Sequence, residues 1–320
     1  MSELLRKYLE RKYVDKNDRT VSLLFPALGR MLRNRKVWNR LNKKGKHSHH
    51  EGPVKEISVP VYEGQNTTAI KIREFLNNFK HPAIKAVLVQ GSIATGEETV
   101  FSDFDGIIII DRDAIQNKRK LDDLHKIVHE SAHIMKRQDV LQHHGWTILI
   151  KQEFKRYPDA EIPSVLLEKS KVLYPATPVN FSIVIDPAFQ DYKILYENLC
   201  NGIYRRLDNN KTFESYYHTK LLISECLLLP AAFLQAIYCK PVWKADSFDQ
   251  IKALLTSDQY QVIESICEIR RNWGTYFNGK RKSAVHPDLI HLIQKNLNAR
   301  IKDLIEVLDA ALEAQENRKG

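Results

Sequence analysis

The chain has 320 residues, more than one domain usually holds, so we expect two domains and an appended segment. Hydrophobic residues make up 43% of the sequence, which is enough for buried cores and excludes a wholly disordered chain. The net charge is +10, from 49 lysines and arginines against 39 aspartates and glutamates. The four cysteines lie far apart without a CxxC pair, which argues against structural zinc and favours reduced thiols.

The excess positive charge is confined to the N-terminus. Residues 1–50 hold 14 lysines and arginines against four acidic residues, so the remaining chain is balanced. Arg30 to Lys46 is the densest part, with eight basic residues and no acidic ones. We predict a basic helical N-terminal extension over residues 1–53, which ends in a stretch broken by Gly45, Gly52 and Pro53. A run of this kind suits contact with a phosphate backbone such as RNA, or packing on an acidic protein face.

Nothing in the sequence predicts a membrane protein. The first residues, MSELLRKYLERKY, are charged and lack the apolar stretch of a signal peptide. The longest apolar run, Leu221 to Tyr238, contains Glu225, Pro230 and Gln235, which favours a buried helix over a membrane span. We therefore expect a cytoplasmic protein without a membrane partner.

Residues 54–180 alternate between strand-like and helix-like patterns. Short apolar runs predict strands, and longer amphipathic stretches predict helices. The predicted strands are Val54–Tyr62, Ala86–Val89, Gly106–Ile110 and Val140–Ile150, and the predicted helices are Thr68–Phe79 and Asp113–Arg137. This order predicts a small mixed sheet with flanking helices.

Residues 181–320 are predicted to be helical. A 3.6-residue apolar repeat from Leu221 to Phe233 predicts one long helix, and Ser247 with Gln250 forms a plausible capping box for the next. Pro287 predicts the start of the last helix. Its apolar stripe consists of Leu289, Ile293, Leu297, Ile301, Leu304, Leu308 and Leu312. The predicted fold class is α+β, a mixed-sheet domain at 54–180 followed by an α-helical bundle domain at 181–320.

The residues with the clearest chemical potential lie between two of the predicted strands. Gln90-Gly91-Ser92 follows the first strand, where Gly91 lets the backbone approach a ligand and Ser92 offers a hydroxyl and an amide to a phosphate oxygen. Ser102-Asp103-Phe104-Asp105 leads into the next strand. Two residues apart on a strand, Asp103 and Asp105 would project from one face with roughly 6–7 Å between their Cα atoms. Such carboxylates can share one or two Mg²⁺ ions with a triphosphate.

This pattern, G-S-x3-G-x5-S-D-x-D, resembles the signature of the minimal nucleotidyltransferases of the DNA polymerase β superfamily. That group includes aminoglycoside nucleotidyltransferases and tRNA-modifying toxins. The resemblance is close over residues 87–110 and weaker to about residue 180. It implies that Gly91 and Ser92, with Ser102 beside them, bind the nucleotide and that Asp103 and Asp105 bind the metal.

The C-terminal helices are similar to those of kanamycin nucleotidyltransferases and to HEPN bundles. In related two-domain enzymes a lysine from this part contacts the triphosphate. The resemblance implies that Lys220 or Lys244 has this role, although either is also compatible with an ordinary solvated lysine.

The sequence departs from the family at the third carboxylate, which normally lies on the next strand. Val140 to Ile150 contains no Asp or Glu. His143 or His144 could accept the proton or bind the metal in its place. Asp139 lies just before this segment and Glu153 just after it, so the general base stays open.

The resemblance implies Mg²⁺-dependent transfer of a nucleoside monophosphate from a nucleoside triphosphate to a hydroxyl, with release of pyrophosphate. A small molecule, a tRNA or a protein could be the acceptor. A nucleotide-second-messenger synthase of the same superfamily is one alternative. A non-catalytic nucleotide-binding or nucleic-acid-binding relative is another, favoured by the missing carboxylate.

Overall fold

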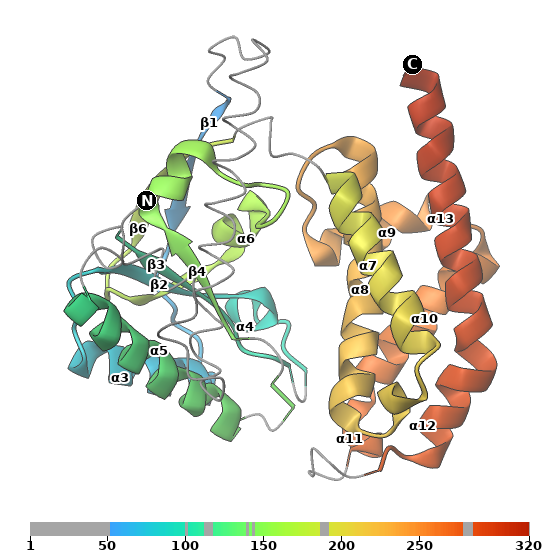
Figure 1. Ribbon diagram of the computed structural model, residues 1–320, viewed down its shortest axis with the longest axis horizontal. Helices are drawn as coiled ribbons and strands as arrows, with labels where there is room; N and C mark the ends of the chain where they lie inside the picture. Colours follow the sequence, from blue (N-terminus) through green and yellow to red (C-terminus); the bar gives the residue numbers. More distant parts are fainter. Residues whose placement is uncertain are drawn as a thin grey trace. The chain divides into compact units, whose positions relative to one another are not determined.

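The computed structural model of the chain describes residues 52–99, 102–111, 118–138, 141–142, 145–185, 192–277 and 284–319. The predicted basic segment Arg30 to Lys46 lies outside these residues. The chain divides into two compact units (Figure 1). The first consists of Met1–Glu98, Ser102–Asp159 and Leu166–Phe189, and the second of Thr99–Phe101, Ala160–Val165 and Gln190–Gly320.

A four-stranded mixed sheet forms the centre of the first unit. It contains β2 (Ile84–Gln90), β3 (Asp105–Ile110), β4 (Trp146–Ile150) and β5 (Lys171–Tyr174), in the spatial order β4-β3-β2-β5. Strand β2 is antiparallel to both β3 and β5, whereas β3 and β4 are parallel. A separate two-stranded sheet pairs β1 (Val54–Val59) with β6 (Val179–Val184). Residue 180, where the predicted first domain ends, lies within β6.

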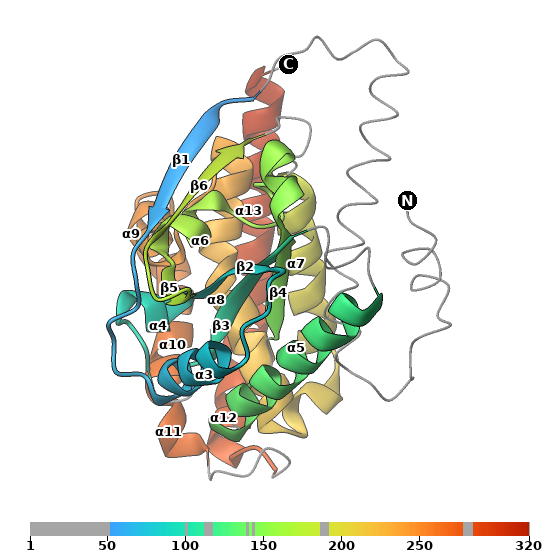
Figure 2. The ribbon, with the colours of Figure 1, turned by 90° about the vertical axis from the view of Figure 1, so that its left-hand side faces the viewer.

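Helices α3 (Thr67–Asn78) and α5 (Lys118–Gln138) cover one face of the four-stranded sheet (Figure 2). Side chains alternate between the two faces of a strand, so the residues of each face can be separated. Ile108 and Ile110 of β3 pack with Leu76 of α3 and Leu124 of α5 in one buried cluster. Ile107 is equally buried but belongs to the other face, as does Asp105.

Local signals in the sequence explain most of these elements. The predicted helix at Thr68–Phe79 is confirmed as α3, and the Asn66 side chain caps it by accepting from the N–H groups of Thr68 and Ala69. The runs predicted for β2 and β3 are confirmed to within two residues. Three short helices, α4 (Gly91–Thr95), η2 (Lys151–Arg156) and α6 (Ser164–Lys169), connect the strands.

The strand predicted over Val140–Ile150 is shorter than expected. The parallel ladder begins only at the pair Gly106 and Trp146, so the described part of this segment is strand from Trp146 onward. Leu141, which lies in a turn, and Gln142 are outside the strand. The side-chain amide of Gln142 makes hydrogen bonds to the backbone of Phe104.

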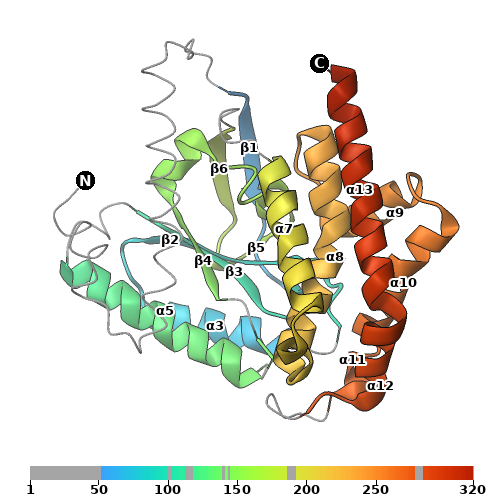
Figure 3. The ribbon, with the colours of Figure 1, turned by 45° about the vertical axis from the view of Figure 1, so that its right-hand side comes forward.

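The second unit is helical, as predicted. Its long helices are α7 (Tyr192–Leu207), α8 (Tyr216–Tyr238), α10 (Ser257–Arg271) and α13 (Asn298–Lys319), with η4 (Asn210–Phe213), α9 (Lys244–Lys252), α11 (Trp273–Tyr276), α12 (Pro287–His291) and η5 (Leu292–Leu297) between them. Figure 3 shows α7, α8 and α13 side by side. The stripe predicted from Leu289 to Leu312 is confirmed, because all seven of its residues are buried.

Helix α8 is the core helix of this unit. By length and composition it is the one helix in the described residues that could cross a membrane, but 56% of its most apolar window is buried inside the protein. It contacts α7, α9, α10 and α13. The Arg206 guanidinium of α7 forms two hydrogen bonds with the Glu225 carboxylate of α8, at 2.6 and 3.0 Å. Packing inside the unit thus accounts for the apolar run from Leu221 to Tyr238.

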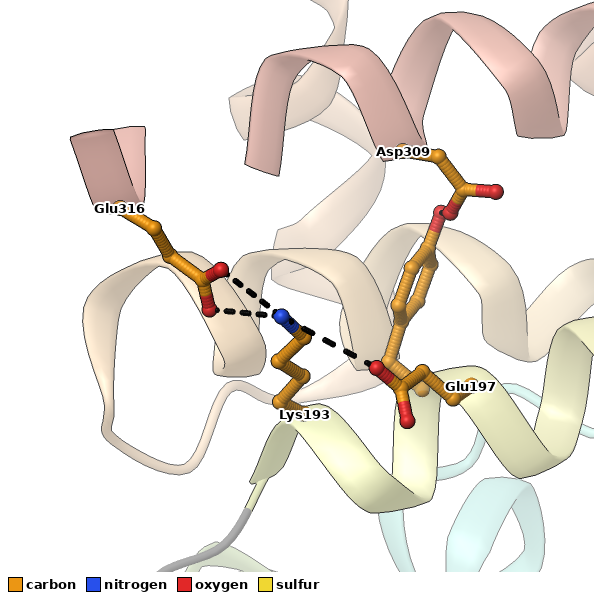
Figure 4. A network of polar contacts seen from close by, with 5 residues as sticks. Lys193, Glu197, Asp309 and Glu316 are labelled. Atoms are coloured by element: carbon orange, nitrogen blue, oxygen red, sulfur yellow. Dashed lines mark hydrogen bonds and ion pairs between the residues drawn. The ribbon is translucent and has the colours of Figure 1, made fainter. Parts of the chain in front are cut away.

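Polar contacts also join α7 to α13 (Figure 4). The Lys193 ammonium lies 2.8 Å from both carboxylate oxygens of Glu316 and 3.9 Å from Glu197. One turn further along α7, the buried Tyr196 hydroxyl donates to Asp309 at 2.8 Å. The contact of Tyr196 differs from those of Lys193 because the Tyr196 side chain is buried, whereas the Lys193 side chain is partly exposed to water.

The capping box predicted at Ser247 and Gln250 is wrong. Helix α9 already begins at Lys244, and the Ser247 hydroxyl donates to the Lys244 carbonyl from within the helix. The capping box of this region belongs to α10, where Thr256 and Gln259 exchange hydrogen bonds between side chain and backbone.

Candidate active site

The motif residues meet where β2 ends and β3 begins. Gln90, the last residue of β2, pairs with Asp105, the first residue of β3. Gly91 follows with a φ of +67°, in the left-handed region that favours glycine. A Cβ atom on Gly91 would lie 2.8 Å from Oδ2 of Asp105. The glycine therefore makes room for the carboxylate of Asp105, as well as allowing the turn into α4.

Asp103 does not lie on the strand, contrary to the sequence prediction. Strand β3 begins at Asp105, and its partner β2 has already ended at Gln90. Asp103 therefore lies before the first residue of β3 that pairs with β2. It is half-buried, as is Asp105, and Ser102 beside it is half-buried as well. A backbone link of one residue, Phe104, joins Asp103 to Asp105.

Sequence reasoning missed the residue that fixes this link. The Gln142 side chain is 3% exposed, and its amide bonds to both backbone groups of Phe104. Its Oε1 accepts from the Phe104 N–H at 2.8 Å, and its Nε2 donates to the Phe104 carbonyl at 2.9 Å. A glutamine 38 positions away carries no local signal of such a role.

The described residues do not supply a third carboxylate beside Asp103 and Asp105. His143, His144 and Asp139 lie outside the described part of the chain. Within that part, no group of three or more His, Cys, Asp or Glu side chains is placed to hold a metal ion.

Glu153 lies at the other end of the sheet from the aspartates. Because β3 and β4 are parallel, the start of β3 lies beside the start of β4, while Glu153 follows the end of β4. Five strand residues separate these edges by about 16 Å. The Glu153 carboxylate accepts from the Ile150 N–H at 2.8 Å, so it has a structural role there.

The chemistry of the donor set still fits magnesium. Mg²⁺ prefers hard oxygen ligands and is commonly bound by one or two carboxylates together with substrate phosphates and water. Asp103 and Asp105 offer two such carboxylates at one edge of the sheet, and Ser92 adds a hydroxyl on the adjoining turn.

The two predicted lysines belong to the second unit. Lys220 lies within α8 and is fully buried, whereas Lys244 is the first residue of α9 and is half-buried. Their contact with a nucleotide stays a prediction.

A pocket of about 600 Å³ lies elsewhere in the first unit. Its lining comes from the end of α3, the loop that follows it and the first half of α5, including Phe75, Phe79, Lys80, Arg119 and Lys126. These helices cover the sheet face opposite to Asp105. The pocket contains none of the predicted site residues and is separate from the candidate active site.

Residues 70–172 match the family model described as a nucleotidyltransferase domain. The match covers about a third of the chain and includes Gly91, Ser92, Asp103 and Asp105. It confirms the resemblance that the motif predicted. None of the curated proteins matches the chain. Among solved structures, spectinomycin adenyltransferase AAD(9) from Enterococcus faecialis, determined with ATP and spectinomycin, is similar over 77% of this chain and 100% of that chain, with 12% identity and a TM-score of 0.40.

Proposed function

We propose that this chain, an enzyme of the nucleotidyltransferase class by virtue of its domain at residues 70–172, transfers a nucleoside monophosphate from a triphosphate to a hydroxyl in a Mg²⁺-dependent reaction. One observation carries the proposal. Gly91 and Ser92, which follow the end of β2 and begin α4, adjoin Asp105 at the start of β3, inside the matched stretch. A turn suited to phosphates therefore lies next to carboxylates suited to metal ions.

In this proposal each residue has a limited task. Asp103 and Asp105 hold one or two Mg²⁺ ions, which when bound neutralise charge on the triphosphate. The Ser92 hydroxyl and amide orient phosphate oxygens, and Ser102 assists beside Asp103. Lys220 or Lys244 adds a positive charge for the triphosphate. Catalysis of this kind depends mainly on positioning and electrostatics.

The bond changes balance without any further reactant. The acceptor hydroxyl oxygen forms a bond to the α-phosphorus, and the bond from that phosphorus to the bridging oxygen of the β-phosphate breaks. Pyrophosphate leaves with the bond electrons, and the hydroxyl proton passes to a base. His143 or His144 is our candidate for that base.

Pyrophosphate release tests the role of the aspartates. We expect Asp103→Asn and Asp105→Asn each to lower the rate of release by at least about a hundredfold, because the metal loses a charged ligand. Released pyrophosphate is quantified directly, and α-labelled triphosphates with a whole-cell extract as the source of acceptor label the product, which also reveals the acceptor class. Equal release by wild type and the double variant Asp103→Asn with Asp105→Asn would refute the proposal.

Two further measurements distinguish two other functions. A nucleotide-second-messenger synthase would form a cyclic or linear oligonucleotide from unlabelled triphosphates without any added acceptor. A non-catalytic relative would bind the triphosphate in calorimetry but form no labelled product. The sequence feature that favours the latter is that the segment from Val140 to Ile150 contains no carboxylate.

RNA is our candidate for a macromolecular partner. The support is the run from Arg30 to Lys46, whose eight basic residues include no acidic neighbour. Such a segment would hold a phosphate backbone near the enzyme, which suits a tRNA acceptor better than a small antibiotic.

A further inference from the structure

The side-chain amide of Gln142 is hydrogen-bonded to the backbone of Phe104, the one residue between the two candidate metal ligands. Both hydrogen bonds of its amide go to Phe104, at 2.8 Å and 2.9 Å, and Asp103 and Asp105 flank that residue. Gln142 is 3% exposed and Phe104 is 2% exposed. Water therefore has little access to replace either hydrogen bond if the amide is lost.

The side-chain amide of Gln142 takes the place of a neighbouring strand at Phe104. The backbone ladder between β3 and β4 starts at Gly106 and Trp146, two residues after Phe104. At Phe104 the side-chain amide of Gln142 supplies the acceptor and the donor that a neighbouring peptide group would otherwise supply. The two hydrogen bonds thus extend the pairing of this edge of the sheet to Phe104, which lies between Asp103 and Asp105.

The ring of Phe104 is held as well. It meets the Trp146 ring edge-on, with 5.7 Å between centroids. The Trp146 indole N–H donates to the Ser131 hydroxyl at 2.9 Å, and that hydroxyl donates to the Ile127 carbonyl at 2.7 Å. Helix α5 therefore fixes the aromatic pair, so the Gln142 amide acts on a residue with little freedom of its own.

We propose that Gln142 is a positioning residue for nucleotidyl transfer, which holds the Asp103 and Asp105 carboxylates in the orientation that binds the metal–triphosphate complex. The inference rests on the proposed function. Gln142 acts through the Phe104 backbone and touches neither substrate nor metal in this scheme. Groups that orient metal ligands typically change metal affinity or activity by about 10-fold to 100-fold when they are removed.

The variant Gln142→Met tests this role, because methionine has a similar length and cannot replace the two hydrogen bonds. The matched control is Glu153→Met. Glu153 is also buried and also bonds to a backbone N–H in the same sheet, but beyond the opposite end of β4. Both variants lose stability, whereas only Gln142→Met disturbs the link between the aspartates. Gln142→Asn keeps an amide that is one carbon shorter and serves as a milder variant if Gln142→Met does not fold.

Three measurements on the full chain decide the question. Hydrogen exchange of the Phe104 amide should be faster in Gln142→Met than in wild type. Mn²⁺ binding in the presence of a non-hydrolysable triphosphate, followed by electron paramagnetic resonance, should weaken by about 10-fold to 100-fold. The kcat of transfer should fall by a similar factor. Glu153→Met should change none of the three by more than about twofold.

Several outcomes would overturn the inference. Unchanged exchange at Phe104 would show that the amide does not hold the backbone. Faster exchange with wild-type Mn²⁺ affinity and kcat would show that the grip is structural only, and equal losses in Glu153→Met would assign them to general destabilisation. If wild type itself transfers no nucleotide, the proposed function fails, and Mn²⁺–triphosphate affinity alone decides, with equal values for wild type and Gln142→Met refuting the positioning role.

Discussion

At the scale of single residues, two glycines of the motif share a backbone conformation but differ in their surroundings. Gly91 has a φ of +67° and Gly96 a φ of +75°, so an alanine at either position is strained by about 1–2 kcal/mol. A Cβ on Gly91 would lie 2.8 Å from the Asp105 carboxylate, whereas a Cβ on Gly96 would have no atom within 4 Å. The pair therefore separates backbone strain from displacement of the aspartate.

We predict that Gly91→Ala lowers the rate of nucleotidyl transfer by at least about tenfold more than Gly96→Ala, while the two variants lose similar stability. The added methyl group must push the Asp105 carboxylate aside, and small displacements of catalytic groups are costly. Steady-state kinetics and urea unfolding of both variants measure the two effects. Equal rates in the two variants would mean that Asp105 tolerates the displacement.

The candidate site was readable from the sequence only where its residues are close in the chain. Gly91, Ser92, Asp103 and Asp105 fall within one strand-turn-strand segment, so their spacing carried the prediction. Gln142 reaches Phe104 across 38 positions, and a buried glutamine looks like any other polar residue in a sequence. Its contribution depends on tertiary packing, which no local pattern encodes.

At the scale of elements, the two contacts between α7 and α13 should differ in what they contribute. Tyr196 is fully buried and donates to Asp309, whereas Lys193 makes its contacts at the surface. Surface ion pairs contribute little because water screens them. We predict that Tyr196→Phe lowers the free energy of unfolding by about 1.5 kcal/mol and that Lys193→Met has no measurable effect. Urea unfolding at equal ionic strength checks both, and the reverse order would contradict the prediction.

Burial of the Cys200 thiol in α7 and the Cys226 thiol in α8 predicts a lower free energy of unfolding at alkaline pH. Burial raises the pKa of Cys200 from 9.0 to about 12, and burial raises the pKa of Cys226 as well. The unfolded chain loses these protons near pH 9, whereas the folded chain keeps them, so their contribution to stability is complete below pH 9 and is lost as the pH rises toward 12. The double variant Cys200→Ala with Cys226→Ala should lose less stability than wild type between pH 9 and 11. Parallel stability curves would refute this.

Elements were predictable where one local signal determined them. Helix α3, helix α8 and the buried stripe from Leu289 to Leu312 followed from their apolar periodicity. The capping box at Ser247 was wrong because helix α9 begins at Lys244 without a side-chain cap, so the capping signal was followed one turn too late. The predicted start of β4 was wrong because this start depends on the residue at which β4 begins to pair with β3.

At the scale of the whole molecule, charge is distributed very unevenly along the chain. The excess of ten positive charges in residues 1–50 equals the net charge of all 320 residues. A soluble helix usually intersperses acidic residues, and the stretch from Arg30 to Lys46 has none. Contact with RNA and packing on an acidic protein face both explain such a segment, and they differ in their response to salt.

We predict that replacing Arg33, Arg35, Lys36 and Arg40 with glutamine weakens RNA binding and flattens its dependence on salt. With each phosphate contact that is lost, fewer counterions are released on binding. The slope of log affinity against log salt should therefore become less steep by about 0.7 per contact on single strands. Transfer to small acceptors should persist, because these residues lie outside the nucleotidyltransferase domain at 70–172. Binding to a tRNA pool across 50–300 mM salt measures the slope. A wild-type protein without RNA affinity at low salt, or a fourfold variant that unfolds, would instead favour a helix packed on protein.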